Sequence, residues 1–419
     1  MANLKITMYY PWLYLKSGGE RTVVEILRRS RHQWRIITNR YEADSTFQEL
    51  MSADITELPR VSVKRTFFHA GLAGARMLTQ KLPLGDTDAM VVACEGLGDL
   101  VTFRNHDVPV FCLCFTPLRL AFDQHYQNRY VEKSGNSWLR RSVLSATMRA
   151  FRTMDRWAWK RYAHVFAISS EVRKRILDGR LCAAGKISVA YPGIDLSHME
   201  PSRTYDRYFL VASRIMWTKN IELAIRAYQD LLQRRPDLHD FRLVIAGFVD
   251  TKSRPYVTHL RELAGKGGGV EFVESPCDLR LFELYRRAYA VLYTPFNEDW
   301  GLVPLEAMAY EKPILAVDRG GPRETIRHGE TGFLLPDEPK AFSSAMETVA
   351  DNPDLVRTMG TAGRMSVRGF EWDEFCRVLD DQLEDGTTPE ADRSHAASKQ
   401  RFSPYRSRDD LRGVRREPL

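Results

Sequence analysis

The sequence has no run of about 18 apolar residues, which a membrane-crossing helix would need. Its first residues also lack the basic start and long apolar core of a secretory signal. It holds only six cysteines, and none of them form a Cys-x-x-Cys pair. Cys112 and Cys114 lie in an apolar run, where a buried strand explains them better than a metal site. We therefore expect a cytoplasmic protein.

Two kinds of nucleotide or nucleic-acid binding are excluded on similar grounds. Gly96 and Gly98 begin a glycine motif, but Val101 occupies the place of the third glycine that a dinucleotide fingerprint requires. The formal net charge is +7, part of it in the tail 386–419. The remaining excess is too small to indicate nucleic-acid binding, and no recognised nucleic-acid module is present.

What the chain does contain is a regular alternation of strand and helix patterns. Its 419 residues, 44% of them hydrophobic, are enough for two or three domains with ample core. Apolar runs predict strands in two blocks, at 5–10, 34–38, 89–94, 110–115, 164–169 and 187–191, and at 208–213, 242–247, 270–272, 288–293, 313–317 and 331–335. Helical patterns are expected at 20–29, 138–161, 171–177, 221–232, 278–287, 303–310, 337–363 and 372–383. Pro192 and Gly193 mark a domain boundary, so we predict an α/β protein with two doubly wound parallel sheets.

The stretch Tyr293–Tyr310 carries the most chemistry. A buried strand leads through a polar turn into a helix, with Pro304 in its first turn. The free amides of Leu302 and Val303 would then face outward from a positive helix end, which favours phosphate. Glu298 and Glu306 flank those amides, an arrangement that suits a sugar nucleotide. The alternative is an ordinary helix start with two solvated acids.

Other candidate ligands follow the ends of other predicted strands, where open α/β sheets bind ligands. Arg214 and Lys219 could clamp a phosphate, or could be two exposed cations. Gly18 and Gly19 would let backbone approach a ligand closely, although such pairs are often simple turns. Arg119 and Asp123 follow another strand, and being four residues apart they could simply pair with each other.

The segment Trp138–Arg161 alternates arginines with apolar and aromatic residues. A basic amphipathic helix of this kind can lie on an anionic membrane. It can equally be a surface helix that packs its apolar side inward. The tail from Gly386 has few apolar residues and is predicted to be disordered.

Taken together, these motifs resemble the retaining glycosyltransferases of family 4, which have the GT-B fold. The resemblance covers roughly residues 5–385 and is strongest in the segments Arg214…Lys219, Glu298-x7-Glu306, Gly320-Gly321-Pro322-x-Glu324 and Thr331-Gly332-Phe333. It implies an acceptor-side domain at 1–192, a nucleotide-sugar domain at 193–372, a helix at 373–385 that packs back on the first domain, and a basic tail at 386–419.

The resemblance also implies roles for the residues of the site. Arg214 and Lys219 would hold the donor diphosphate and stabilise the leaving nucleotide. Glu306 would bind the ribose and Glu298 would lie beside the transferred sugar. The amides of Leu302 and Val303, and Gly18 and Gly19 from across the cleft, would approach the phosphates. Members of the family generally need no metal, and the sequence has no Asp-x-Asp cation site in a suitable loop.

The mannosyltransferase branches, which use GDP-mannose, are the most similar in the segments Glu298–Glu306 and Thr116–Asp123; a UDP-sugar is the other possibility. Members with the Thr-Pro-x-Arg segment usually carry a histidine before the threonine, where this sequence has Phe115. His125 and His106 are the candidates to replace it, although a surface or loop position explains either one better.

The resemblance therefore predicts a metal-independent hexosyltransferase that moves α-mannose from GDP-mannose to a glycan or lipid-linked acceptor. Phe115, Arg119 and Asp123 would lie on the acceptor side. Two alternatives stay open, namely a sugar-nucleotide epimerase of the same architecture and a catalytically silent donor-binding subunit. Peripheral contact with an anionic membrane on the cytoplasmic side is a further expectation.

Overall fold

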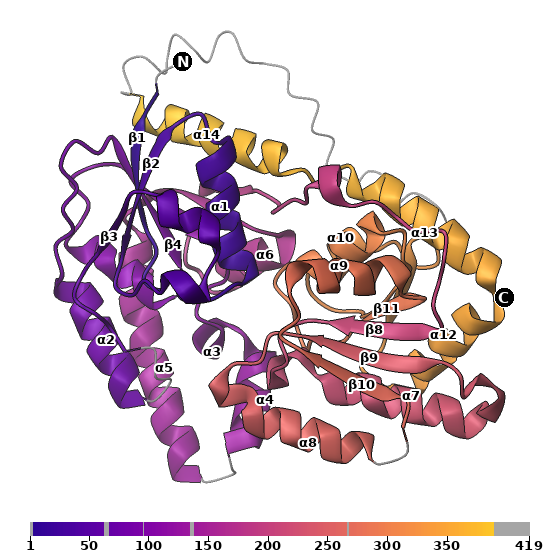
Figure 1. The fold of residues 1–419 in the computed structure, drawn as a ribbon. Helices are drawn as coiled ribbons and strands as arrows, with labels where there is room; N and C mark the ends of the chain where they lie inside the picture. Colours follow the sequence, from indigo (N-terminus) through magenta and orange to yellow (C-terminus); the bar gives the residue numbers. More distant parts are fainter. Residues whose placement is uncertain (1–2, 63–66, 95, 135–137, 266–267, 389–419) are drawn as a thin grey trace, which may run out of the picture.

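The computed structural model describes residues 3–62, 67–94, 96–134, 138–265 and 268–388. The chain forms two α/β domains that lie side by side. Each domain has a parallel sheet with helices on both faces (Figure 1). The fold class predicted from the alternating pattern is therefore confirmed. Each sheet is parallel throughout, and its strands are apolar runs because helices cover both faces.

The N-terminal sheet has seven strands in the order β3-β2-β1-β4-β5-β6-β7. Its strands are β1 (Lys5–Tyr9), β2 (Gln33–Thr38), β3 (Ile55–Glu57), β4 (Ala89–Cys94), β5 (Val110–Cys114), β6 (Tyr162–Ala167) and β7 (Ile187–Val189). All six strands predicted for this domain are present, and the edge strand β3 is additional. The order places β1 and β4 at the centre of the sheet, so their carboxyl ends open toward the second domain.

The C-terminal sheet has six strands in the order β10-β9-β8-β11-β12-β13. They are β8 (Tyr208–Ala212), β9 (Arg242–Gly247), β10 (Val270–Glu274), β11 (Ala290–Tyr293), β12 (Ile314–Val317) and β13 (Gly332–Leu335). Strands β8 and β11 pair directly although about 80 residues separate them, with Val291 opposite Leu210. The strand order reverses between them, which is where doubly wound sheets bind ligands.

Fourteen α-helices are present among the described residues. They are α1 (Gly18–Arg29), α2 (Phe67–Thr79), α3 (Arg119–Phe122), α4 (Gln124–Ser134), α5 (Trp138–Trp159), α6 (Ser170–Asp178), α7 (Ile221–Arg234), α8 (Arg254–Ala264), α9 (Asp278–Arg287), α10 (Leu302–Ala309), α11 (Pro322–Thr325), α12 (Pro339–Asp351), α13 (Pro353–Val367) and α14 (Trp372–Thr387). Helices α2, α4 and α8, and the one-turn helices α3 and α11, lie outside the predicted helical ranges. The single helix expected at 337–363 is two helices, because Pro353 cannot donate a backbone hydrogen bond and starts a new one.

Helix α14 follows the C-terminal domain in the sequence but packs against the N-terminal domain (Figure 1). Arg31 holds it through Glu384 at 2.7 Å and Asp381 at 2.8 Å, and Ser30 donates to Asp380 at 2.7 Å. The helix continues to Thr387, so Gly386, the predicted start of the tail, is helical. The remainder of the predicted tail, residues 389–419, lies outside the described residues.

Candidate functional site

The loops after β8 and β11 meet at the carboxyl edge of the C-terminal sheet. The first loop ends in a short 3-10 helix, Trp217–Lys219, and Asn220 follows with a left-handed backbone (φ 49°). The ammonium of Lys219 forms an ion pair with Glu298 of the second loop, and both side chains are mostly buried. Thr294 ties the loops together a second time, because its hydroxyl donates to the Lys219 carbonyl at 2.9 Å. Two residues expected at one ligand are thus brought together.

The electrostatic setting of Glu298 keeps it ionised. Burial by itself would raise the pKa of its carboxyl, but Lys219 opposes this through its charge and its hydrogen bond. The charge of Arg119 and the hydroxyl of Tyr293 act in the same direction as Lys219, so the pKa of Glu298 lies below its usual value. The loop therefore presents a carboxylate rather than a neutral acid.

Helix α10 begins just after this carboxylate. Gly301 precedes it with φ at 98°, and a Cβ there would lie 2.5 Å from the Tyr293 hydroxyl. No side chain caps the helix, and the amides of Leu302 and Val303 belong to its first turn, where no intrahelical acceptor exists. Both residues are only half-buried. The start of α10 is thus an uncapped, partly accessible positive helix end.

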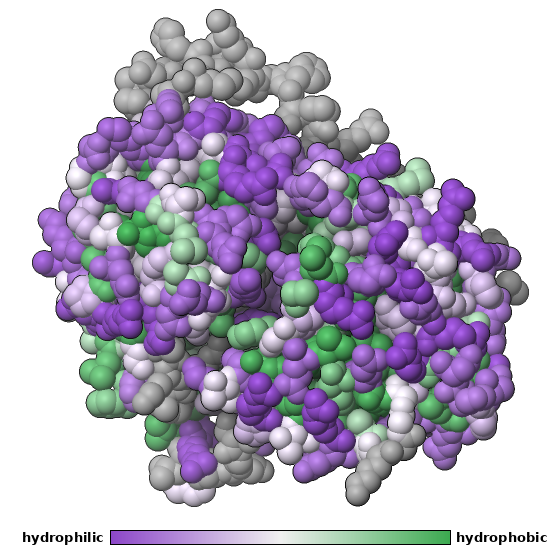
Figure 2. Space-filling view, in the orientation of Figure 1, coloured by the Kyte–Doolittle hydropathy of each residue, from purple (hydrophilic) through white to green (hydrophobic). Residues whose placement is uncertain are grey.

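The first turn of α1, from the other domain, lies opposite α10. A Cβ at Gly18 would be 3.7 Å from the Cδ1 atom of Leu302, so the two helix starts approach each other closely. A Cβ at Gly19 would lie 2.7 Å from the Tyr10 hydroxyl and 3.8 Å from the Phe115 ring. The surface is hollowed between the two domains (Figure 2). The two predicted halves of a donor site therefore face each other.

Glu306 lies one helical turn further into α10. Its Oε2 accepts a hydrogen bond from the Tyr285 hydroxyl at 2.6 Å. Burial raises the pKa of the Glu306 carboxyl above its usual value, although Tyr285 and the charge of Arg21 on α1 oppose the shift. One carboxylate oxygen is thus held by the protein, and the group is only partly buried.

Arg214 occupies the start of the loop after β8, five residues before Lys219. Together with Leu15 of the N-terminal domain, and with Phe248 and Asp250, it lines a small depression. Within the part of the chain that the structure describes, its guanidinium makes no ion pair. The Arg214 guanidinium therefore lies at the domain boundary and is not paired with a carboxylate of the described residues.

The acceptor-side candidates are placed differently from one another. Phe115 is buried at the end of β5, with its ring centroid 6.1 Å from that of Tyr10. Arg119 and Asp123 do pair with each other, Nη2 to Oδ2 at 3.1 Å, as the alternative interpretation allowed. Arg119 also reaches the second domain, where it donates to the carbonyl of Asn297. These two residues therefore join the domains.

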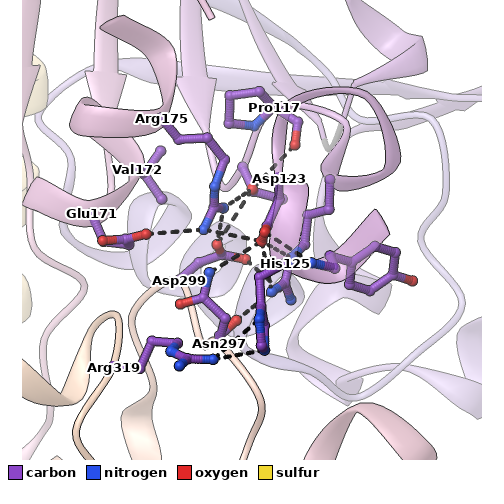
Figure 3. Close-up of polar contacts among 12 residues, drawn as sticks. Pro117, Asp123, His125, Glu171, Val172, Arg175, Asn297, Asp299 and Arg319 are labelled. Carbon is purple, nitrogen blue, oxygen red and sulfur yellow. Dashed lines mark hydrogen bonds and ion pairs between the residues drawn. The ribbon is translucent and has the colours of Figure 1, made fainter. Parts of the chain in front are cut away.

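Two further residues of this junction were not among the predicted ones. Arg175 of α6 donates to Thr116 Oγ1 at 2.6 Å and pairs with Asp299, the residue after Glu298 (Figure 3). Asp123 lies 3.5 Å from the same guanidinium. A charged residue within a nine-residue helix looks like a solvated one in the sequence, since its partner belongs to the other domain.

The two histidines proposed to replace the missing one lie far apart. His125 contacts Arg319 at 2.7 Å (Figure 3), and burial, followed by the charges of Arg319 and Arg129, lowers its pKa. His106 is exposed on the loop before β5, at the opposite end of that strand from Phe115. His106 is therefore in no position to replace a group at residue 115.

Two absences concern only the described part of the chain. There, no three His, Cys, Asp or Glu side chains gather in a group that could hold a metal ion. In the same ranges, none of the helices has the length and the apolar character needed to cross a membrane. That the reaction needs no metal stays a prediction.

Two parallel α/β domains that face each other, with an uncapped helix start and a Lys–Glu pair at the junction, define a GT-B architecture. The solved structures that share this fold include HepE and sucrose-phosphate synthase. HepE of Anabaena, in complex with UDP and glucose, has a TM-score of 0.68 and 15% identity over 91% of this chain and 99% of its own. Sucrose-phosphate synthase of Thermosynechococcus elongatus has a TM-score of 0.69 and 17% identity over 91% and 98%.

Two family models match the sequence in succession. Residues 17–198 match Glycosyltransferase Family 4, and residues 197–366 match Glycosyl transferases group 1. The chain belongs to the family 4 glycosyltransferases of the GT-B fold, as the sequence motifs had indicated.

Curated relatives match a shorter stretch. Alpha-1,3/1,6-mannosyltransferase ALG2 of Homo sapiens is 36% identical over 198 residues, which is 43% of this chain and 48% of the relative. D-inositol 3-phosphate glycosyltransferase of Streptomyces scabiei is 31% identical over 205 residues, or 45% and 46%. The chain thus spans about half the length of the curated relatives it matches.

Proposed function

We propose that the protein is a retaining hexosyltransferase that transfers α-mannose from GDP-mannose to a glycan or lipid-linked acceptor. The observation that carries this proposal is the approach of Gly18 to Leu302, 3.7 Å from its ideal Cβ to the Cδ1 atom, beside the Lys219–Glu298 pair. The start of α10, a cation and two carboxylates of the C-terminal domain then face the start of α1 across one ligand. That set matches a nucleoside diphosphate with its attached sugar.

In this proposal each group has a defined task. Lys219 and Arg214 bind the diphosphate, and they stabilise the charge that develops on the leaving nucleotide as the sugar–phosphate bond breaks. The amides of Leu302 and Val303 donate to the phosphate oxygens, and Gly18 and Gly19 leave room for them on the opposite side.

The two carboxylates bind the remaining parts of the donor. Glu306 accepts hydrogen bonds from the ribose hydroxyls with the oxygen that Tyr285 leaves available. Glu298 lies beside the sugar and lowers the energy of the positive charge at its reacting carbon. Phe115 carries no proton-accepting group, so the departing phosphate oxygen takes the proton of the acceptor hydroxyl.

The choice of sugar rests on the relatives. ALG2 is named as a mannosyltransferase in four of the organisms whose sequences match. The solved HepE complex, by contrast, contains UDP. GDP-mannose is therefore the donor we favour, and a UDP-hexose is the competitor that the experiment must separate from it.

A thermal-unfolding panel with GDP-mannose, GDP-glucose, UDP-glucose and UDP-galactose tests the proposal. A donor at 100 times its Kd stabilises the folded protein by about 2.7 kcal/mol. We expect GDP-mannose to give the largest rise in midpoint. If none of these compounds raises the midpoint, the proposed donor site is wrong.

Turnover separates the remaining possibilities. An epimerase would convert the bound sugar nucleotide without any acceptor, and the product would appear by chromatography. A silent subunit would bind the donor but release no nucleotide with any glycan or lipid-linked acceptor. A transferase releases GDP only with an acceptor, in an amount equal to the mannosylated acceptor that forms.

A membrane-surface contact through α5 is proposed for the same enzyme. Its inward stripe, Leu144, Met148, Phe151, Asp155 and Ala158, is buried. Other residues of α5 are exposed, namely Trp138, Val143 and Trp157 at 76%, 53% and 61%, and the arginines 140, 141 and 149. Packing inward therefore accounts for the buried residues of α5 only. Exposed tryptophans among cations favour an anionic lipid surface for the others.

A further inference from the structure

The loop Asn297–Trp300, which carries Glu298, is held mainly by the opposite domain. At Asn297, Arg119 donates to the backbone carbonyl, and the side-chain amide donates to Asp123 at 3.1 Å (Figure 3). At Asp299, Arg175 binds the carboxylate. At the end of the loop, Trp300 donates its indole N–H to the Pro192 carbonyl at 2.9 Å.

Glu298 itself is held by its own domain. Its backbone carbonyl accepts from the amide of Gly321 at 2.9 Å, and a short parallel bridge joins it to Gly320. The side chains of Asn297 and Asp299 contact the N-terminal domain, whereas the side chain of Glu298 between them contacts Lys219 of its own domain. Contacts that hold Asn297 and Asp299 toward the N-terminal domain therefore direct Glu298 the other way, toward Lys219.

Helix α6, which supplies Arg175, is itself anchored to the second domain. Ser169 caps the helix by accepting from the amide of Val172 at 3.0 Å, and its hydroxyl donates to the carbonyl of Asp299. Glu324 of α11 accepts from the amides of Ser170 at 2.8 Å and Glu171 at 2.9 Å. A carboxylate at the positive end of α6 is a favourable pairing. Arg175 thus projects from a helix whose start is fastened to the other domain.

Two guanidiniums and three carboxylates meet at this junction. Arg119 and Arg175 face Asp123 and Asp299, and the side chain of Arg175 is only 4% exposed. Glu171 also pairs with Arg175, at 3.4 Å. Removing one member of such a buried set leaves another charge without its partner. The loop would then move to bring the remaining charge toward water.

We propose that Arg175 is a positioning residue for Glu298: by holding Asp299 from the N-terminal domain, it sets the place of the neighbouring carboxylate beside Lys219. The placement of the donor-binding acid then depends on the contact between domains. This inference rests on the proposed function, because it gives Glu298 the donor sugar as its ligand. Arg175 itself touches no atom expected to react.

Hydrogen–deuterium exchange tests the positioning without any substrate. We expect faster exchange of peptides covering 294–302 in Arg175→Met and in Asp299→Asn. The matched control is Arg29→Met, because Arg29 also joins distant segments, binding Asp195 at 3.1 Å and Asp373 at 2.7 Å, but does not touch the loop. The control should leave exchange at 294–302 at the level of the parent.

Kinetics then test the consequence for the reaction. With GDP-mannose as the probe and GDP release as the readout, Arg175→Met should lower kcat on the order of 100-fold, the effect of misplacing a group by about 1 Å. The donor KM should change little, since the diphosphate contacts remain. Arg175→Lys should recover part of the loss, and the double variant Arg175→Met/Asp299→Asn should be no worse than either single one.

The outcomes distinguish this inference from the function on which it rests. Unchanged exchange at 294–302 in Arg175→Met, with a normal unfolding midpoint, overturns the positioning role. An equal loss of kcat in Arg29→Met also overturns it, because any domain contact would then serve. If the parent protein releases no nucleotide from GDP- or UDP-sugars, the proposed function fails, while the exchange result still decides how the loop is held.

Discussion

Lys219 and Glu298 form an ion pair across the carboxyl ends of the adjacent strands β8 and β11, although 79 residues separate them in the sequence. The pair keeps both charges in place while the site contains no phosphate. In the proposed function, a donor diphosphate would add negative charge next to Lys219, which would then interact with both the phosphate and the carboxylate. The pair would therefore prearrange the site at little reorganisation cost.

Replacing Lys219 with alanine should slow sugar transfer sharply. The lost ammonium would no longer stabilise the charge on the leaving nucleotide, which we expect to raise the barrier by about 2–4 kcal/mol. Steady-state release of GDP from GDP-mannose measures the effect. Lys340→Ala, which removes an exposed lysine from α12, is the control and should behave like the parent. Undiminished transfer by Lys219→Ala would remove Lys219 from the catalytic machinery.

The affinity for GDP-mannose should fall as the pH is lowered through the raised pKa of Glu306. Burial raises that pKa, so the carboxyl takes up a proton at a higher pH than an ordinary glutamate. Its protonated form accepts hydrogen bonds from the ribose poorly. Calorimetric titration between pH 4.5 and pH 8 measures the change, and the diphosphate diester of the donor does not itself titrate there.

Glu306→Gln is the matched control for that pH dependence. The amide cannot ionise, so the affinity of this variant should be weaker at pH 8 and nearly independent of pH. If the variant keeps the slope of the parent, another group accounts for it and Glu306 does not bind the ribose as proposed.

Replacing two glycines near the site with alanine should affect different properties, donor affinity at Gly18 and stability at Gly321. A Cβ at Gly18 meets Leu302 at an ordinary 3.7 Å, so Gly18→Ala should fold normally but weaken donor binding, by roughly 1–3 kcal/mol for one misplaced methyl. A Cβ at Gly321 would lie 2.1 Å from the Trp300 carbonyl oxygen. Gly321→Ala should therefore lower the unfolding midpoint, at a cost of about 1–3 kcal/mol. Donor affinity and thermal unfolding, measured on both, separate the two roles. Parent-like affinity in Gly18→Ala would contradict the close approach of the phosphates.

The predicted fold came from local patterns, and those patterns decide most of it. Apolar runs such as Arg242–Gly247 and Ala89–Cys94 are buried strands because both faces of a parallel sheet are covered. Helix α8 escaped prediction, since it begins at Arg254 within a polar stretch and buries only Tyr256, Val257 and Leu260. These three residues nevertheless recur at the spacing of a helix, so the sequence does contain a signal for α8.

Some residues of the candidate site could likewise be predicted from the sequence, and others could not. Residues that follow strand ends, such as Lys219 and Glu298, could be placed at one sheet edge because strand ends converge there. Arg175 and Asp299 could not, since their pairing depends on how two separately folded domains pack. The sequence offers no local rule for that packing.

The exposed residues of α5 should bind vesicles that contain anionic lipid. Changing Arg140, Arg141 and Arg149 to glutamate should weaken binding on the order of 100-fold, given about 1 kcal/mol for each basic side chain near an anionic surface. Co-sedimentation with vesicles of phosphatidylcholine and phosphatidylglycerol measures it. A variant with Arg226, Arg280 and Arg357 changed to glutamate has the same net charge and alters the C-terminal domain. If both variants bind as the parent does, α5 is only a packed surface helix.

Asp155 on the inward side of α5 should limit stability at neutral and higher pH. Its side chain is fully buried, and neither carboxylate oxygen has a hydrogen-bond partner among the described residues. Burial, followed by the charge of Asp99, raises the pKa of Asp155 well above its usual value. The folded protein thus holds a proton that the unfolded chain releases, and the stability present at low pH is lost as the pH rises above about 3.9.

Asp155→Leu should add about 1–3 kcal/mol to the free energy of unfolding at pH 8 and less near pH 4. Thermal unfolding at both pH values measures the difference, with Thr153→Leu on the exposed side of α5 as control. An equal gain at both pH values would mean that better packing, and not the carboxyl proton, accounts for the change.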